Sequence, residues 1–155
     1  MSIYGLNHGN STIEAGDIVS ISECQTGYVK GTEKCPVLKV EKASYNNPEA
    51  VVGVVEYKVI VNEKDKNQDA QSKKFKFNGY VVKPGEYLSI VVFGITDVNI
   101  NSTVQIKTGQ KLTLSESEGT ARTVTKSDLW NLGTLGKALE NSSGSGKIKA
   151  FVNCK

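Results

Sequence analysis

The sequence predicts an all-β fold: a single-domain sandwich or barrel of short antiparallel strands with glycine-hinged corners. Three observations support this prediction. Short runs of β-branched and aromatic residues recur along the chain, 15 glycines stand against 3 prolines, and one corner pattern occurs three times. Such spacing, with Gly and Asn between the runs, is typical of sandwiches and barrels rather than of βαβ units. We expect at most one or two short helical turns.

The length of 155 residues corresponds to one ordinary domain. A domain of this size buries about two-thirds of its unfolded surface, so its core needs no metal or disulfide. We expect two parts: a flexible N-terminal arm over residues 1–12 and a β-barrel or sandwich domain over residues 13–155. The arm would order on a neighbouring molecule during assembly. The alternative is a disordered terminus without a role.

The expected strands are short segments with partial alternation of apolar and polar residues. Ala50–Val61 is the most apolar segment and predicts a central strand, with a bulge or close backbone approach at Gly53. Residues 62–74 are polar and precede the alternating Phe75–Lys76–Phe77, so we expect the tip of a long hairpin there. Further strands are expected at 18–22, 37–40, 80–82, 87–93, 96–100, 103–106, 111–114, 121–124 and 147–152.

The helical signal is confined to two short segments. Ser127 could cap a single turn that carries Leu129 and Trp130, and a second turn is expected over residues 135–140. We interpret Trp130 as a plug over a barrel end or as an interface anchor, rather than as a carbohydrate platform.

The repeated corner has the form aliphatic-x-x-Gly-polar-x-aliphatic-[Ser/Thr]-aliphatic. It occurs at residues 13–21, 82–90 and 106–114, where the sequence reads IEAGDIVSI, VKPGEYLSI and IKTGQKLTL. In each copy the first aliphatic residue should end a strand, and the glycine should supply the positive φ of a tight turn. The alternating residues should then begin the next strand. The alternative is that β proteins reuse turns of this composition independently.

The charge pattern gives little support for nucleic acid or membrane as a partner. The formal net charge is +3, and the charged residues are scattered. The densest basic run, Lys73, Lys74 and Lys76, is interrupted upstream by acidic residues and favours a solvated hairpin. The first ten residues lack the basic and apolar regions of a signal peptide, and no apolar run approaches the length of a membrane span.

The three cysteines, Cys24, Cys35 and Cys154, argue against both a disulfide framework and a zinc site. Their number is odd and no C-x-x-C spacing occurs. Assembly in a reducing cytoplasm, with free thiols, fits this count best. The alternative is that Cys24 and Cys35 pair across a hairpin if they are oxidised.

No residue pattern indicates catalysis, so we expect a non-enzyme without catalytic residues, cofactor or metal. The only histidine, His8, lies in a leader rich in glycine and asparagine, and one histidine cannot supply a metal cluster. The carboxylates of Glu14, Asp17, Glu116 and Glu118 lie beside expected turns, where exposed acids are common. Residues 133–137, GTLGK, lack the leading glycine and the following Ser or Thr of a phosphate-binding loop.

Five segments, read in order, resemble a known kind of protein: EAGDIVSI, then PVLKVEKA with NPEAVVGVV, then YLSIVVFGITDV, then IKTGQKLTLSESEGTA, and finally LGTLGKALE with GSGKIKAFV. This succession resembles a β-rich module at the C-terminal ends of phage neck and tail appendages. It is also similar to phage capsid decoration, or cement, proteins. The resemblance extends from about Glu14 to Val152, which is nearly the whole chain.

The resemblance implies a structural role in a virion that is assembled in the host cytoplasm. Proteins of this kind bind the outside of assembled capsids, commonly as trimers, so the implied partner is the major capsid protein, with a homotrimer or a head-fibre protein as further partners. The appendage version can belong to a self-cleaving region. Gln110 stands where that version has an acidic residue, so self-cleavage is not carried over. The alternatives are a fibre-base module and, from another class, a self-processing peptidase fragment or carbohydrate-active domain.

Overall fold

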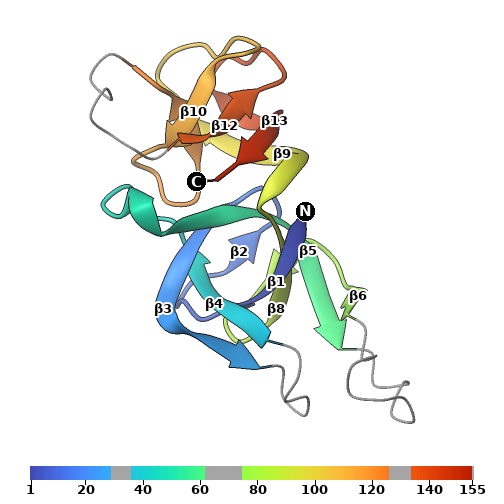
Figure 1. Cartoon of the computed structure of the whole chain (residues 1–155). Helices are drawn as coiled ribbons and strands as arrows, with labels where there is room; N and C mark the ends of the chain where they lie inside the picture. Colours follow the sequence, from blue (N-terminus) through green and yellow to red (C-terminus); the bar gives the residue numbers. More distant parts are fainter. Residues whose placement is uncertain (29–35, 62–74, 126–133, 155) are drawn as a thin grey trace.

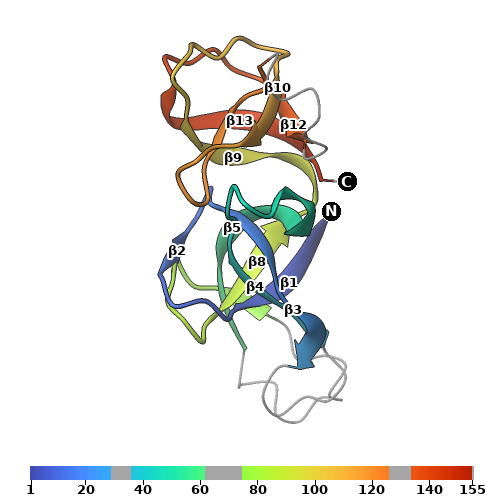
Figure 2. The same ribbon diagram turned by 90° about the vertical axis from the view of Figure 1, so that its left-hand side faces the viewer.

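The computed structural model describes residues 1–28, 36–61, 75–125 and 134–154. The described chain is nearly all β and forms two small closed sheets stacked on each other (Figures 1 and 2). The helical structure within these ranges is one 3₁₀ turn, η1 (Pro48–Ala50). The all-β, barrel-type fold class is therefore confirmed, but with two barrels where the sequence predicts one sandwich or barrel.

The first barrel has the strand order β3-β4-β1-β8-β5, and a further pairing between β3 and β5 closes the ring. A short strand, β6, extends β5 at the edge, and β2 and β7 pair separately with each other. The bounds are β1 (Ser2–Asn7), β2 (Ile13–Glu14), β3 (Ile18–Tyr28), β4 (Pro36–Lys42), β5 (Val51–Val61), β6 (Phe75–Phe77), β7 (Val81–Val82) and β8 (Tyr87–Val91).

The second barrel closes in the order β10-β11-β9-β13-β12. Its long pair is β9 with β13, which run antiparallel from Phe93–Asn153 to Asn101–Ser145. Only Val92 separates β8 from β9, so the chain passes directly from one barrel into the other. The bounds are β9 (Phe93–Asn101), β10 (Lys111–Leu114), β11 (Ala121–Thr123), β12 (Thr134–Ala138) and β13 (Ser145–Asn153).

The two barrels share part of one hydrophobic core. Ile18, Val54 and Val91 of the first barrel pack in the same buried cluster as Val98 and Leu112 of the second. A separate cluster around Val55, Leu88 and Ile90 fills the first barrel. Burying a side chain of this size stabilises the fold by about 1.5–3 kcal/mol. The shared cluster therefore ties the barrels into one body.

The three predicted corners have the same geometry. Gly16, Gly85 and Gly109 have φ values of +94°, +87° and +91°, as the corner pattern predicts. In each corner the N–H of the residue after the glycine donates to the carbonyl three residues earlier, at 3.0, 3.0 and 3.1 Å. The side chain of that same residue accepts the backbone N–H of the earlier residue, at 2.8, 2.8 and 2.9 Å. Asp17, Glu86 and Gln110 thus accept the same hydrogen bond. An amide can replace the acid at this position because the bond requires only a side-chain oxygen.

The first corner also joins the two barrels. The N–H of Gly16 donates to the carbonyl of Val55, and the carbonyl of Gly16 accepts the N–H of Asn99 in β9. The Asn99 amide donates to Asp17 Oδ1 at 2.8 Å, and Lys42 Nζ lies 3.6 Å from Asp17 Oδ2. Because Asp17 is only 5% exposed, its carboxylate depends on these partners instead of water.

The expected flexible arm over residues 1–12 is wrong. Residues 2–7 form β1, which pairs antiparallel with β8 and parallel with β4. Gly5 allows this insertion because a Cβ there would lie 2.9 Å from Ile90 Cδ1 and 3.1 Å from the Leu38 carbonyl oxygen. The Asn7 amide is buried and donates to the carbonyls of Ser11 and Val82. The N-terminal segment, whose composition is typical of a free terminus, therefore forms a strand of the first barrel.

Two further predictions differ from the structure. The helical turn expected over residues 135–140 is wrong, because Thr134–Ala138 is strand β12. Gly136 explains this: a Cβ there would lie 2.0 Å from the Phe151 carbonyl oxygen, so the glycine permits close pairing with β13. The strand expected over residues 103–106 is reduced to an isolated bridge between Ile106 and Ser142.

The close approach predicted at Gly53 is confirmed, since a Cβ there would lie 2.3 Å from the Val91 carbonyl oxygen. Several predictions concern residues outside the described ranges. These are the hairpin tip over 62–74, the turn over 127–131 with Trp130, and the positions of Cys35, Lys73 and Lys74.

Replacing Asp17 by alanine should destabilise the protein by about 2–4 kcal/mol, because the Glu14 N–H and the Asn99 amide lose a buried acceptor. The matched control is Gln110→Ala, which removes the same side-chain acceptor from an exposed corner and should cost less than about 1 kcal/mol. Urea unfolding followed by circular dichroism measures both. Equal losses in the two variants would contradict the role of Asp17 as the joint between the barrels.

The Cys154 thiol should react slowly in the folded protein. It is unpaired, packs against the shared core, and burial raises its pKa to about 12. At pH 8 the reactive thiolate should therefore be rarer than in an exposed thiol by a factor on the order of 10³. The measurement is alkylation by iodoacetamide in a Cys24→Ser, Cys35→Ser variant, with the same variant in urea as control. Alkylation at the same rate in both states would show that the thiol is accessible.

Candidate functional surface

Six aromatic side chains gather on the outer face of the first barrel. The strand register explains why. Tyr4 of β1 and Tyr57 of β5 both lie opposite Ser89 of β8. Val59 of β5 lies opposite both Tyr87 of β8 and Phe77 of β6. Residues that lie opposite one another in a sheet share one face, as do residues two apart in a strand, so these side chains all lie on the same face. We call this surface the aromatic wall; its members are Tyr4, Tyr57, Phe75, Phe77, Tyr80 and Tyr87.

The rings of the aromatic wall pack as two groups of three. Phe75 contacts Tyr4 and Tyr87, with ring centroids 4.1 and 6.0 Å apart. Phe77 contacts Tyr57 and Tyr80 edge-on, with both centroid distances 5.4 Å. Tilted and edge-on contacts are the favoured geometries for aromatic pairs and contribute about 0.5–1.5 kcal/mol each. The wall is therefore an ordered surface.

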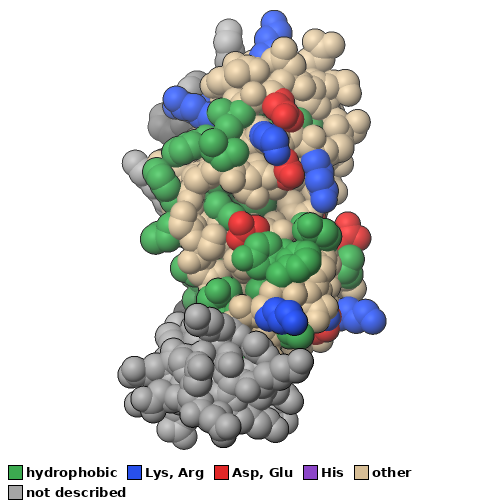
Figure 3. Space-filling model, turned by 90° about the vertical axis from the view of Figure 1, so that its right-hand side faces the viewer, with side chains coloured by type: hydrophobic (Ala, Val, Ile, Leu, Met, Phe, Trp, Pro, Cys, Tyr) green, Lys and Arg blue, Asp and Glu red, His purple; other side chains and the backbone are tan. Residues whose placement is uncertain are grey.

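Much of this aromatic surface remains open to solvent. Tyr4 is 40% exposed, Phe77 52% and Tyr80 62%. Figure 3, which views the molecule from the side of β5 and β6, shows hydrophobic side chains gathered on this face. Contiguous exposed apolar surface of this kind commonly marks a site of interaction with another molecule.

A β-bulge places one carboxylate beside the aromatic wall. The register of β5 against β8 shifts between Val55 and Tyr57, so Glu56 is an extra residue in β5. Its Oε2 accepts the hydroxyl of Ser89 at 3.0 Å and that of Ser2 at 3.3 Å. Bulges commonly redirect a side chain in this way. Glu56 and Tyr57 consequently both reach the outer face.

An ion pair joins β5 to the corner that precedes β8. Lys58 Nζ is 2.5 Å from Glu86 Oε2. The hydrogen bond from Lys58 is the main cause that lowers the pKa of Glu86, against the opposing effect of burial. Both charges are thus compensated within the protein.

A smaller apolar patch lies where the two barrels meet. The rings of Phe93 and Phe151 are 5.1 Å apart and edge-on, Ile95 lies opposite Phe151, and Ile95 is 65% exposed. Met1, at 76% exposure, joins this patch through backbone hydrogen bonds to residues 92 and 93. The next cross-strand pair on the same face of β9 and β13 is Asp97 with Lys149, which form an ion pair.

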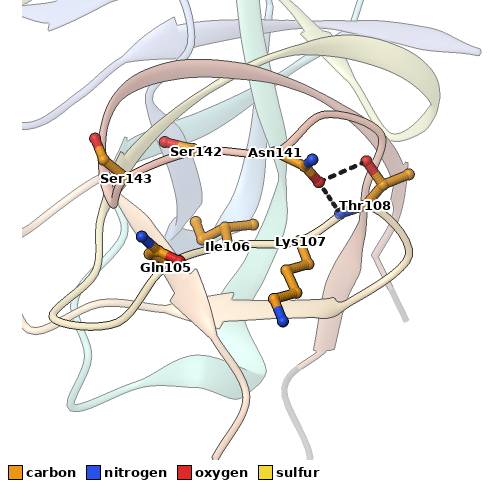
Figure 4. Close-up of a pocket in the computed structure, with 7 residues that line it drawn as sticks. All are labelled: Gln105, Ile106, Lys107, Thr108, Asn141, Ser142 and Ser143. Carbon is orange, nitrogen blue, oxygen red and sulfur yellow. Dashed lines mark hydrogen bonds between the residues drawn. The ribbon is translucent and has the colours of Figure 1, made fainter.

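An open groove lined mainly by residues with polar side chains lies on the second barrel, between residues 105–108 and 141–143 (Figure 4). The Asn141 Oδ1 atom accepts the backbone N–H and the hydroxyl of Thr108, at 2.8 and 3.0 Å. The side chains that line the groove include no histidine, cysteine or carboxylate. These contacts hold the corner at Gly109 in place.

The residues that the sequence analysis weighed for chemistry are distributed over the end of β1, the first corner and the turn between β10 and β11. His8 follows β1, with its Nδ1 3.0 Å from the Ser22 hydroxyl. Glu14 and Asp17 belong to the first corner, and Glu116 and Glu118 are exposed on the turn between β10 and β11. Within the described ranges there is no group of three or more metal-ligating side chains.

The aromatic wall is the feature that sequence reasoning missed. The alternation Phe75–Lys76–Phe77 and the nearby Tyr80 and Tyr87 are its sequence signal. That signal predicts a strand with one aromatic face. It does not predict that β1 brings Tyr4 to the same face from the far end of the chain.

Comparisons with known proteins give a similarity in structure but no match in sequence. No protein-family model and no curated protein sequence matches the chain. The chain is similar in structure to the N base of the head fiber gp8.5 of bacteriophage phi29, with 12% sequence identity and a TM-score of 0.49, over 99% of this chain and 95% of that chain. Because so few residues are identical, the match describes the path of the backbone only. Among the described residues there is no helix long and apolar enough to span a membrane.

Proposed function

We propose that this protein is a structural component of a bacteriophage particle, which binds the outside of an assembled capsid as a decoration protein. The observation that carries the proposal is the aromatic wall, an exposed and ordered set of Tyr and Phe side chains on one face of a rigid barrel. The phage setting comes from the succession of segments between Glu14 and Val152 that resembles decoration proteins.

The chemistry of the wall suits a protein partner. Tyr and Phe are enriched in the buried centres of protein interfaces, and charged residues are depleted there. Aromatic side chains also provide a disproportionate share of binding energy when they enter pockets on the partner. The rings of Phe77, Tyr57 and Tyr80 meet at interplanar angles of 77° and 66°, so their edges project and can interdigitate with a partner's side chains.

The scaffold under the wall reduces the entropic cost of docking. The strands β1, β8 and β5 that carry it are each paired on both sides. Side chains and backbone that are already ordered lose little freedom on binding, which preserves affinity. A rigid platform of this kind is what repeated attachment to a capsid lattice requires.

The proposed partner is the major capsid protein, with contact through apolar side chains and sheet edges rather than through charge. Two other arrangements follow from the resemblance: a homotrimer, and attachment to a head-fibre protein as its base. The copy number on each particle distinguishes a decoration protein from a fibre base. A decoration protein should be present in many copies on each particle, whereas a fibre base should be present in few.

Truncating the wall should weaken capsid binding. The double variant Phe77→Ala, Tyr80→Ala removes two exposed rings, and because a central interface aromatic is commonly worth about 2 kcal/mol or more, binding should fall by at least about 10-fold. The control variant Val104→Ala, Leu139→Ala removes comparably exposed apolar groups from the second barrel. Co-sedimentation with empty capsids of the phage that encodes the protein measures the binding of each.

Circular dichroism should first show that both double variants keep the β-rich fold. Equal capsid binding by the two variants would refute the docking role of the wall. Absence of binding by the unchanged protein would refute the proposed function itself. Loss of mass on long incubation would favour the self-processing alternative.

A further inference from the structure

Glu56 is held in a fixed position at the edge of the aromatic wall. The bulge in β5 brings its carboxylate onto the outer face, and the buried hydroxyl of Ser89 donates to its Oε2. Tyr4 and Tyr57 lie on either side of Ser89, because both are its cross-strand partners. The carboxylate and two tyrosine rings therefore belong to one small area spanning β1, β8 and β5.

The Glu56 carboxylate has capacity for a further donor. Ser2 and Ser89 both donate to Oε2, and no donor from the described residues bonds to Oε1. In the described part of the chain, the ion pairs involve Asp17, Glu86 and Asp97 but not Glu56. A carboxylate can accept two parallel N–H donors from a guanidinium group. Among the described residues, Glu56 thus presents a negative charge that no cation pairs with.

The surroundings favour arginine over lysine as the missing cation. A guanidinium is planar, matches a carboxylate with a fork of donors, and stacks on aromatic faces, whereas an ammonium is a compact and strongly hydrated point charge. The protein uses the same chemistry internally: the Arg122 guanidinium carbon lies 5.9 Å from the centre of the Tyr45 ring.

We propose that Glu56, Tyr4 and Tyr57 form a recognition site for an arginine side chain presented by a protein partner. The inference deepens the proposed function, because it names the chemistry that the docking partner must supply: one arginine within an otherwise apolar contact surface. Glu56 provides the charge and one or two hydrogen bonds. The tyrosines provide stacking surface, and the Ser89 hydroxyl keeps the carboxylate oriented.

A direct test uses the intact protein and small probes. Titration with acetyl-arginine-methylamide, followed by ¹⁵N NMR, should shift the amide signals of Glu56, Tyr57 and Ser89 in a saturable manner, with a dissociation constant of about millimolar order, as expected for a single anchored side chain. The neutral isostere acetyl-citrulline-methylamide and the lysine analogue should each bind at least about 5-fold more weakly. Saturation by citrulline or lysine at the same concentration as arginine would overturn the proposal.

Variants locate the site. Glu56→Gln should weaken arginine binding at least about 5-fold, because it removes the charge but keeps a similar shape. Glu116→Gln is the matched control: it removes one exposed carboxylate from the second barrel and should bind arginine as the unchanged protein does. Unchanged binding by Glu56→Gln would overturn the proposal.

The two proposals fail separately. If the arginine probe does not bind while capsids still bind through the aromatic wall, the recognition site is refuted and the proposed function stands. If the probe binds at Glu56 while capsids do not bind, the site stands and the capsid proposal is refuted. If both bind, Glu56→Gln should also reduce co-sedimentation with capsids, and an unchanged value would refute the site's part in docking.

Discussion

The hydrogen-bonded corner at Gly16 and Asp17 is the contact on which the arrangement of the two barrels depends. Its backbone pairs with Val55 in the first barrel and with Asn99 in the second, and the Asp17 carboxylate accepts the Asn99 amide. Hydrogen bonds are directional, whereas apolar burial is not. The shared apolar cluster holds the barrels together, and the corner sets their relative orientation.

This fixed orientation determines which surfaces lie on one side of the molecule. Because β9 continues β8 after a single residue, the chain passes from the first barrel into the second without a loop. Met1 hydrogen-bonds to residues 92 and 93 at the start of β9, while Tyr4 of the same strand β1 belongs to the aromatic wall. Strand β1 therefore runs from the smaller patch around Phe93 to the aromatic wall.

Local patterns in the sequence were sufficient to predict the corners, but they could not predict which distant strands pair with one another. A glycine followed by an acceptor side chain makes the same turn three times, because the needed φ and the needed hydrogen bonds lie within a few residues. The position of β1 depends instead on partners more than 80 residues away in β8, as in the pairing of Ser2 with Val91. Likewise, Gly136 forms part of a strand only because β13 approaches its backbone. The wall depends on such pairings, so no local pattern could predict it.

An exposed aromatic surface beside a sheet edge also carries a risk of non-specific association. The edge strand β6 has only three residues, which limits its use as a template for other strands. The rings pack against one another, which reduces the apolar area that each presents to water. The Glu56 carboxylate adds a further constraint, because an apolar surface without a cation would have to bury that charge unpaired, at a high free-energy cost. Glu56 therefore has two effects on binding. It disfavours non-specific apolar contacts, and it favours a partner that supplies the complementary charge.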